Sequence, residues 1–245
     1  MSLRDLFSNI TCALFPPACL SCDNIIPSRA EEAFCEDCRK QLVFIEGSIC
    51  PICGRTYPDS PSTGHLCGHC IEKPPYFSLA RAAASYETLI EEAIHRFKYG
   101  RNPAFGVALA SFLGTVDFPD MDWQAYDMII PVPLHIRKLR QRGFNQSLVL
   151  ARGLSKTHRL PVNFSLLKRR KLTLTQTGLD KKQREKNVKD AFCVRHPEKI
   201  EGRNIILVDD VYTTGATTSE CAKVLIRAGA GHVAVIVLAR VPVVH

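Results

Sequence analysis

The sequence predicts an α/β protein, with a parallel sheet flanked by helices and a small cysteine-rich module ahead of it. Two wholly apolar runs, residues 205–208 and 233–238, lie on either side of a helical pattern, which is the order of a strand–helix–strand unit. Eight of the 11 cysteines form four Cys-x-x-Cys pairs ahead of residue 71. We therefore divide the chain into an N-terminal module over residues 1–75 and an α/β domain over residues 80–245.

Composition excludes several classes of protein. The chain has 245 residues, of which 46% are hydrophobic and 23% charged, values typical of a globular protein and not of a disordered or fibrous one. No apolar run approaches the roughly 18 residues of a membrane-spanning helix, and the N-terminus lacks the continuous apolar segment of a secretory signal. We expect a cytoplasmic protein without a membrane span, in which paired thiols hold metal more readily than they form disulfides.

Apolar spacing and capping residues predict the individual elements. Residues 1–16 repeat apolar side chains at three- and four-residue steps, which indicates an amphipathic helix ended by Pro16 and Pro17. Asn102 and Pro103 are typical of an N-cap and a first helical position. In chain order, the elements predicted for the α/β domain are helices at 86–97 and 103–114, a strand at 128–132, a helix at 145–154, a strand at 205–208, a helix at 217–228 and a strand at 233–238.

The paired cysteines have the spacing of zinc ligands. The pattern is Cys-x2-Cys-x12-Cys-x2-Cys followed by Cys-x2-Cys-x13-Cys-x2-Cys. Four thiolates close a tetrahedron around Zn²⁺ and leave no open position, so such a site is structural. The predicted ligands of two zinc ions are Cys19, Cys22, Cys35, Cys38, Cys50, Cys53, Cys67 and Cys70. Because the segment has few apolar residues in a regular pattern, we expect the ions to supply its folding free energy.

Other interpretations of these cysteines stay open. Redox-active Cys-x-x-Cys motifs and iron–sulfur ligation use the same residues. The pairs could bind sequentially, as two stacked ribbons, or alternately, as a cross-braced module. His65 and His69 flank the last pair and could replace a ligand.

The run from Ile205 to Thr218 carries the clearest sign of chemistry. A buried strand leads into Asp209 and Asp210, and a short loop containing Gly215 then turns into a helix. Ligands of open α/β sheets bind at such strand ends, where loop amides and a helix N-terminus can hold a phosphate. The two carboxylates suit sugar hydroxyls, or a divalent ion bound through water. The loops typical of nucleoside triphosphatases and dinucleotide-binding proteins are absent from the sequence.

This run resembles the 5-phosphoribosyl 1-diphosphate signature of the type I phosphoribosyltransferases. Further motifs resemble the ComF family, also called GntX-like, of competence-associated phosphoribosyltransferase-like proteins, which likewise carry an N-terminal double zinc ribbon. The motifs are His95–Tyr99, Pro131–His135, Arg142–Gln146 and Gln176–Leu179, with Arg184 and Asn187.

The resemblance implies a type I phosphoribosyltransferase-like sheet and a role for each motif. Asp209 and Asp210 are expected to contact the ribose hydroxyls, and Mg²⁺ to arrive with the diphosphate. The loop expected around the 5-phosphate consists of Thr213, Thr214, Gly215, Ala216 and Thr217. Pro133 to Arg137 and Arg142 are expected at the diphosphate. A mobile lid is expected over Leu172 to Asn187, where Gln176, Lys181, Lys182 and the third catalytic candidate, Arg184, lie.

The sequence departs from the phosphoribosyltransferases that act on 6-oxopurines. Those relatives have an acid where Thr213 stands, and a threonine hydroxyl has no comparable basicity near neutral pH. This difference argues against hypoxanthine or guanine as the acceptor. No other segment identifies the acceptor of a possible phosphoribosyl transfer.

The positive charge is concentrated in one segment. Residues 131–190 hold 16 Lys and Arg but 3 Asp and Glu, although the whole chain has a net charge of only +8. Such a field favours polyanionic partners. Two functions fit it: a ComF-type protein that binds 5-phosphoribosyl 1-diphosphate with Mg²⁺ and is linked to DNA uptake and competence, or a non-catalytic protein that binds single-stranded DNA or a competence helicase. Aromatic residues near the basic run 168–171 are sparse for a stacking surface.

Chelation tests the zinc prediction. Removing zinc from the folded protein is expected to unfold residues 19–70, because the ions replace the missing apolar core. Amide hydrogen exchange before and after chelation measures this loss segment by segment. Unchanged protection of residues 19–70 in metal-free protein would contradict the prediction.

Overall fold

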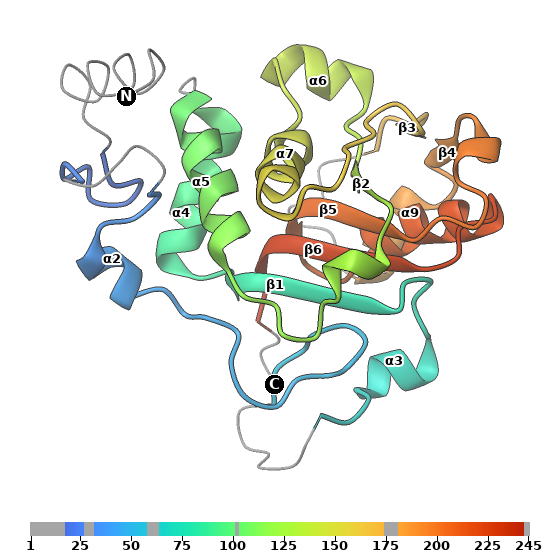
Figure 1. Cartoon of the computed structure of the whole chain (residues 1–245), viewed down its shortest axis with the longest axis horizontal. Coiled ribbons are helices and arrows are strands. Elements are labelled where there is room, and N and C mark those ends of the chain that lie inside the picture. Colours follow the sequence, from blue (N-terminus) through green and yellow to red (C-terminus); the bar gives the residue numbers. More distant parts are fainter. Residues whose placement is uncertain (1–17, 27–31, 58–63, 101–102, 174–180, 243–245) are drawn as a thin grey trace.

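The computed structural model describes residues 18–26, 32–57, 64–100, 103–173 and 181–242. Its centre is a parallel sheet with the strand order β1-β6-β5-β2 (Figure 1). These strands are β1 (Leu79–Ser85), β2 (Met128–Pro131), β5 (Ile205–Tyr212) and β6 (Val233–Arg240). A separate antiparallel ribbon pairs β3 (Leu167–Arg169) with β4 (Phe192–Val194).

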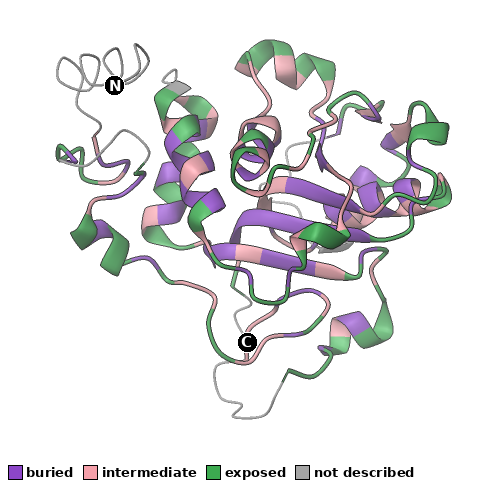
Figure 2. Ribbon diagram, viewed as in Figure 1, coloured by how far each residue is buried: buried purple, intermediate pink, exposed green. Residues whose placement is uncertain are grey.

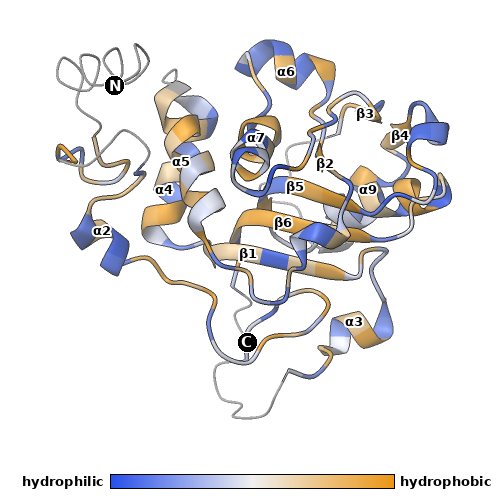
Figure 3. Ribbon diagram, in the orientation of Figure 1, coloured by the Kyte–Doolittle hydropathy of each residue, from blue (hydrophilic) through white to orange (hydrophobic). Residues whose placement is uncertain are grey.

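The two central strands are covered on both faces. Every residue of β6 is buried, as are the first four of β5 (Figure 2), and Figure 3 shows that both strands are mainly hydrophobic. Successive side chains point to opposite faces. Ile206 and Val208 therefore join the core under α4 (Thr88–Tyr99), α5 (Pro103–Thr115) and α7 (Gln146–His158), whereas Ile205 and Leu207 join the core under α9 (Ala216–Arg227). This explains why wholly apolar runs were the strongest signal of the sheet.

The helices that cover the sheet follow the predicted order. One face carries α4 (Thr88–Tyr99), α5 (Pro103–Thr115) and α7 (Gln146–His158). The other carries α9 (Ala216–Arg227), against which α8 (Lys181–Val188) packs. The remaining helices are α2 (Glu36–Lys40), α3 (Gly68–Glu72), α6 (Ile136–Arg142) and two 3-10 turns, Trp123–Ala125 and Pro197–Lys199.

Helices α5 and α7 approach each other closely because small residues line their contact. A Cβ atom added to Gly153 of α7 would lie 2.3 Å from the carbonyl oxygen of Ala110 on α5. Gly106 and Gly114 of α5 are similarly confined by α4 and α7 side chains. A side chain at these positions would push the helices apart, so the glycines determine how closely α5 and α7 pack.

The cysteine-rich segment covers the outer edge of β1. Ala80 donates a backbone hydrogen bond to Ile52 (2.6 Å), and Ser85 donates one to Val43 (2.8 Å). These bonds satisfy backbone groups that an edge strand would otherwise leave free. Nearer the start of the same segment, the ring of Phe34 packs edge-on against Phe112 of α5, with 5.5 Å between ring centroids. The segment thus shares the main core, which corrects the expectation that zinc alone replaces apolar burial there.

Other differences from the sequence predictions have local causes. β1 was not predicted because its alanine-rich run lacks the β-branched residues typical of strands. β5 runs four residues farther than predicted, since it stays paired with β6 as far as Tyr212. The predicted helix at 1–16 lies outside the described residues, and the domain division at residues 75 and 80 stays a prediction. Among the described residues, no helix has the length and apolarity needed to cross a membrane.

Candidate functional site

The eight paired cysteines form two separate clusters in sequential order. Cys19, Cys22, Cys35 and Cys38 make one cluster, and Cys50, Cys53, Cys67 and Cys70 make the other, with the ligand atoms of each within 4.8 Å of one another. The Sγ atoms of Cys22 and Cys35 are 3.7 Å apart, and those of Cys53 and Cys67 are 3.6 Å apart. Tetrahedral Zn–S bonds of about 2.3 Å require S···S distances near 3.8 Å. Both clusters therefore fit zinc, and the cross-braced arrangement is excluded.

The local backbone favours the thiolate form of Cys50 in the second cluster. Burial alone would raise the pKa of the Cys50 thiol, but the surrounding backbone amides outweigh burial and lower it to about 6. The backbone amide of Cys67 donates to the Cys50 sulfur at 3.5 Å. His65 stacks on the ring of Tyr57, with 4.2 Å between ring centroids, and belongs to neither cluster.

Asp209 lies inside β5 and accepts hydrogen bonds from two directions. Its Oδ1 accepts from the Ser147 hydroxyl (2.9 Å) and from the Asp210 amide (2.9 Å). Ser147 is in the first turn of α7, which Asn145 caps by accepting from the Ser147 amide at 3.1 Å. Burial, followed by the charge of Asp210, raises the pKa of Asp209 to about 7. The carboxyl group is therefore poised to gain or lose a proton near neutral pH.

Asp210 is paired with a lysine that lies far from it along the chain but close to it in space. The Lys98 Nζ atom, near the end of α4, lies 2.8 Å from Asp210 Oδ2, and both side chains are largely buried. Burial works against the charge on Lys98, but the charge and hydrogen bond of Asp210, together with the charge of Asp209, outweigh burial and raise the pKa of Lys98. The pair keeps Lys98 charged directly beside the two carboxylates.

The loop after β5 is shorter than predicted. Only Thr213 to Gly215 lie between β5 and α9, whereas Ala216 and Thr217 form the first turn of the helix. Gly215 has a φ angle of +76°, which side chains rarely adopt. Its carbonyl oxygen accepts from the Thr218 hydroxyl at 3.1 Å. The sharp turn therefore places the N-terminus of the 12-residue helix α9 close to the end of β5 that carries Asp210.

A cluster of cations lies near the carboxylates. The pKa of Lys138 is lowered by burial and by the neighbouring charges of Arg169 and Arg142. The pKa of Arg169 is lowered by burial, whereas the charge of Asp209 acts in the opposite direction. The Nε atom of Arg169 is buried without a hydrogen-bond partner among the described residues. Lys138 therefore lies close to two other cations, and this concentration of positive charge suits an anion.

The other predicted site residues are distributed around this centre. The buried Pro133 follows β2, where the Asn145 amide donates to the Val132 carbonyl oxygen at 3.1 Å. Arg137 is exposed in the first turn of α6. Arg142 ends α6 with its guanidinium 5.4 Å from the ring centroid of Tyr99, beside Lys98.

The predicted lid is partly helical. Arg184 lies in α8, and no hydrogen bond or ion pair among the described residues joins it to Asp209 or Asp210. Lys181 and Lys182 begin the same helix, and Gln176 lies outside the described residues. The part of the expected lid from residue 181 to residue 187 is therefore helical and α8 packs against α9, whereas the role of Leu172 to Asn187 as a lid stays a prediction.

Three residues of this centre were not singled out from the sequence. Lys98 lies within one of the ComF-like motifs, Ser147 follows another, and Arg169 belongs to the basic run. Each lies far along the chain from the residue it faces, so no local pattern could pair them. The motifs quoted for the resemblance were the only signal that pointed to Lys98.

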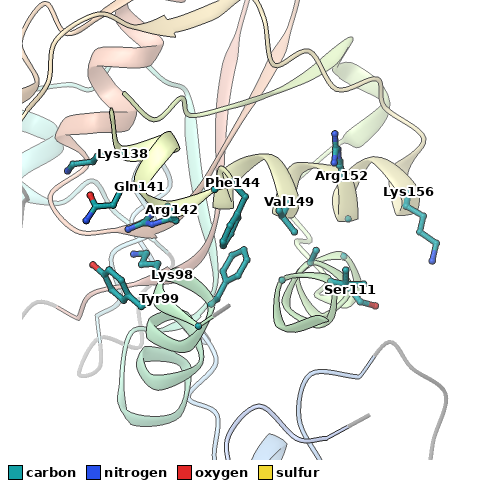
Figure 4. A pocket seen from close by; sticks show the side chains of 18 of the residues that line it. Lys98, Tyr99, Ser111, Lys138, Gln141, Arg142, Phe144, Val149, Arg152 and Lys156 are labelled. Carbon is teal, nitrogen blue, oxygen red and sulfur yellow. The ribbon is translucent and has the colours of Figure 1, made fainter. Parts of the chain in front are cut away.

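A groove leads away from this centre between α5 and α7 (Figure 4). Its volume is about 1300 Å³. Lys98, Lys138 and Arg142 gather at one end, and Arg152 and Lys156 lie at the other, with Phe144 and Val149 between them. Its described lining residues include no Asp or Glu. The groove therefore offers an apolar floor with basic edges.

Comparisons with known proteins agree with this architecture. The model of the "Double zinc ribbon domain" family matches residues 10–71. The chain is 35% identical over 220 residues to the "DNA utilization protein YhgH" of Shigella flexneri, covering 84% of this chain and 96% of that protein. It is 31% identical over 220 residues to the "Competence protein F" of Haemophilus influenzae (84% and 96%), and 29% identical over 232 residues to the "Competence protein ComFC" of Bacillus subtilis (86% and 89%).

Solved structures show a weaker similarity. The glutamine phosphoribosylpyrophosphate amidotransferase of B. subtilis aligns with a TM-score of 0.40 and 18% identity, over 59% of this chain and 30% of that chain. This similarity is too weak to define the fold, which the parallel strand order β1-β6-β5-β2 of the chain itself defines.

The fold and the site define a class of protein in which a double zinc ribbon is joined to a parallel α/β domain flanked by helices. The chain belongs to the ComF family, together with the DNA utilization and competence proteins named above.

The raised pKa of Asp209 predicts a particular pH dependence of stability. Its folded-state value of about 7 lies above the ordinary 3.8, so the folded protein holds this proton more tightly than the unfolded chain does. Stability should therefore fall as pH rises from about 4 to about 7. Asp209→Asn removes this contribution, so between pH 5 and 8 the parent should lose roughly 1–3 kcal/mol more unfolding free energy than the variant.

Urea unfolding at pH 5 and pH 8 measures this difference. Asp117→Asn, at an exposed site, serves as the control and should follow the parent. Equal pH dependence of the parent and Asp209→Asn would contradict the raised pKa.

Proposed function

We propose that the α/β domain binds 5-phosphoribosyl 1-diphosphate together with Mg²⁺. The observation that carries this proposal is the meeting of two carboxylates, a glycine-containing phosphate-type loop and a cation cluster at one end of the sheet. Carboxylates accept hydrogen bonds from sugar hydroxyls, and loop amides and cations hold phosphates. A ligand with a ribose between a phosphate and a diphosphate offers a matching group to the carboxylates, the loop and the cations.

Each part of the site has a role in this proposal. Asp209 and Asp210 accept from the ribose hydroxyls, and Ser147 and Lys98 hold the two carboxylates in position. The amides of Thr213 to Gly215 and of the first turn of α9 donate to the 5-phosphate. Because Asp209 is desolvated, a hydrogen bond or ion gained there carries more energy than one at an exposed carboxylate.

The diphosphate would lie on the other side of the ribose. Arg142, Lys138 and Arg169 supply positive charge there, which stabilises a leaving diphosphate as its charge develops. Mg²⁺ bound to the diphosphate oxygens would neutralise part of the same charge. We further propose that the protein acts in the cytoplasm and is linked to DNA uptake; the printed names of its relatives, "DNA utilization protein" and "Competence protein", support a role in handling DNA.

Calorimetric titration tests the binding proposal. The zinc-loaded protein should bind 5-phosphoribosyl 1-diphosphate in a Mg²⁺-dependent manner, and Asp209→Asn/Asp210→Asn should weaken binding at least tenfold. The reason is that hydrogen bonds to charged groups contribute about 1.5–3 kcal/mol each. Asp117→Asn/Asp122→Asn removes the same charge from exposed positions and should bind like the parent. No binding by the parent would overturn the proposal.

A second function is favoured by the groove between α5 and α7. Its basic edges suit a nucleic acid backbone, and its apolar floor suits unpaired bases, so we propose it as the surface for single-stranded DNA. The tilted ring pair of Phe97 and Phe144, with 5.4 Å between centroids, contributes to that floor.

Salt dependence of DNA binding tests this second function. Arg140 and Arg152 are exposed residues that line the groove. Arg140→Gln/Arg152→Gln should weaken single-stranded DNA binding and reduce the slope of log K against log salt by about 1.4, or ~0.7 per lost phosphate contact. Arg170→Gln/Arg195→Gln removes two exposed charges outside the groove and should leave the slope unchanged. Equal slopes for both double variants would exclude the groove.

A further inference from the structure

The second zinc cluster touches the central sheet through a buried arginine. Arg240 is the last residue of β6 and is only 8% exposed. Its Nη1 donates to the carbonyl oxygen of Cys53, and its Nη2 lies 3.8 Å from the Cys53 sulfur. A guanidinium is rarely buried without a charged partner. Here the zinc-ligating sulfur is that partner.

The same guanidinium stacks on a tyrosine that supports the candidate phosphate loop. Arg240 Cζ lies 4.5 Å from the ring centroid of Tyr212, its neighbour in the β5–β6 register. Tyr212 is 5% exposed, and Phe77 packs edge-on against its ring. A Cβ atom added to Gly215 would lie 2.2 Å from the Tyr212 hydroxyl oxygen. The Tyr212 side chain therefore lies directly against the turn at Gly215.

We propose that Arg240 and Tyr212 are positioning residues that couple the second zinc centre to the Thr213–Gly215 loop. The contacts run without a gap from the Cys53 sulfur through the guanidinium and the phenol ring to Gly215. The role of the loop in phosphate binding rests on the proposed function. The coupling itself is a property of the folded chain.

The charge of the zinc centre explains how the coupling works. Four thiolates around Zn²⁺ carry a net charge of −2, which Arg240 partly neutralises. When zinc leaves, Cys53 is no longer held in place, so the buried guanidinium loses its fixed partner, an unfavourable state that it relieves by moving. Tyr212 then loses its cation–π partner, and the turn at Gly215 loses a fixed support. By linkage, a ligand that orders the loop must also tighten zinc binding by the same factor.

Two other arginines hold the ribbons without entering this path. Arg81 is 7% exposed and fastens the second ribbon by donating to the Pro51 carbonyl oxygen (3.1 Å) and to Asp120 (2.7 Å). Arg96 fastens the first ribbon by donating to the Leu20 carbonyl oxygen at 2.8 Å. Among the described residues, neither contacts a cysteine sulfur or Tyr212. Arg81 is therefore a matched control for simple docking.

Zinc release and amide exchange test the coupling on the full zinc-loaded chain. In Arg240→Gln, a chromophoric chelator should remove one of the two zinc ions 10–100-fold faster than from the parent, because contacts to ligands tune metal affinity by that factor. Amides of residues 213–217 should also exchange faster. Arg81→Gln should match the parent in both measurements. Parental behaviour of Arg240→Gln, or equal changes in Arg81→Gln, would overturn the proposal.

Tyr212→Leu separates the two ends of the path. It leaves the contact between Arg240 and Cys53 intact but removes the ring under Gly215, so exchange of residues 213–217 should rise while zinc release stays near the parental rate. Parental loop exchange would overturn the coupling. If Arg240→Gln does not fold, Arg240→Lys replaces it, since losing the planar stack should still speed loop exchange; unchanged exchange in that variant counts against the proposal.

A ligand arm distinguishes failure of the coupling from failure of the proposed function. With Mg²⁺, 5-phosphoribosyl 1-diphosphate should slow zinc release from the parent but not from Tyr212→Leu. If the parent does not bind this ligand, the proposed function fails, and exchange and zinc release still decide the coupling. If the parent binds it with no effect on zinc release, the coupling fails alone.

Discussion

Burial of β5 and β6 on both faces is the constraint on which the rest of the structure depends. Strands covered by helices on both sides admit almost no polar side chain, so their charged residues are confined to the carboxyl end of the sheet. Asp209 and Asp210 occupy that end on β5, and Arg240 occupies it on β6. The end of α4 and the first turn of α7 also lie at this end of the sheet, so Lys98 and Ser147 reach the two carboxylates.

The carboxylates differ in environment although they are neighbours in sequence. Asp209 meets the first turn of α7 and is held by Ser147, whereas Asp210 meets α4 and is held by Lys98. One carboxyl group is thus desolvated with a raised pKa and the other is ion-paired. Such a contrast between adjacent acids is typical of sites that bind or transform charged ligands.

The zinc ribbons complete the sheet as well as adding metal centres. Backbone hydrogen bonds that β1 donates to the carbonyl oxygens of Ile52 and Val43 pair its open edge, and apolar side chains such as Phe34 continue the core over α5. The ribbons cannot be removed without exposing a strand edge and part of the core. This arrangement gives the second zinc centre a direct contact with the residues behind the phosphate-type loop.

Local patterns in the sequence were sufficient for the zinc ligands, the two central strands, the four long helices α4, α5, α7 and α9 and the acidic pair, because each depends on residues only a few positions apart. The tertiary structure alone decided the sequential grouping of the cysteines, the pairing of Lys98 with Asp210 and the seat of Arg240 beside Cys53. The tertiary structure also decided that alanine-rich β1 is a strand, since its pairing with β6 outweighs the weak strand propensity of alanine. These features join residues far apart along the chain, and only packing determines which of them meet.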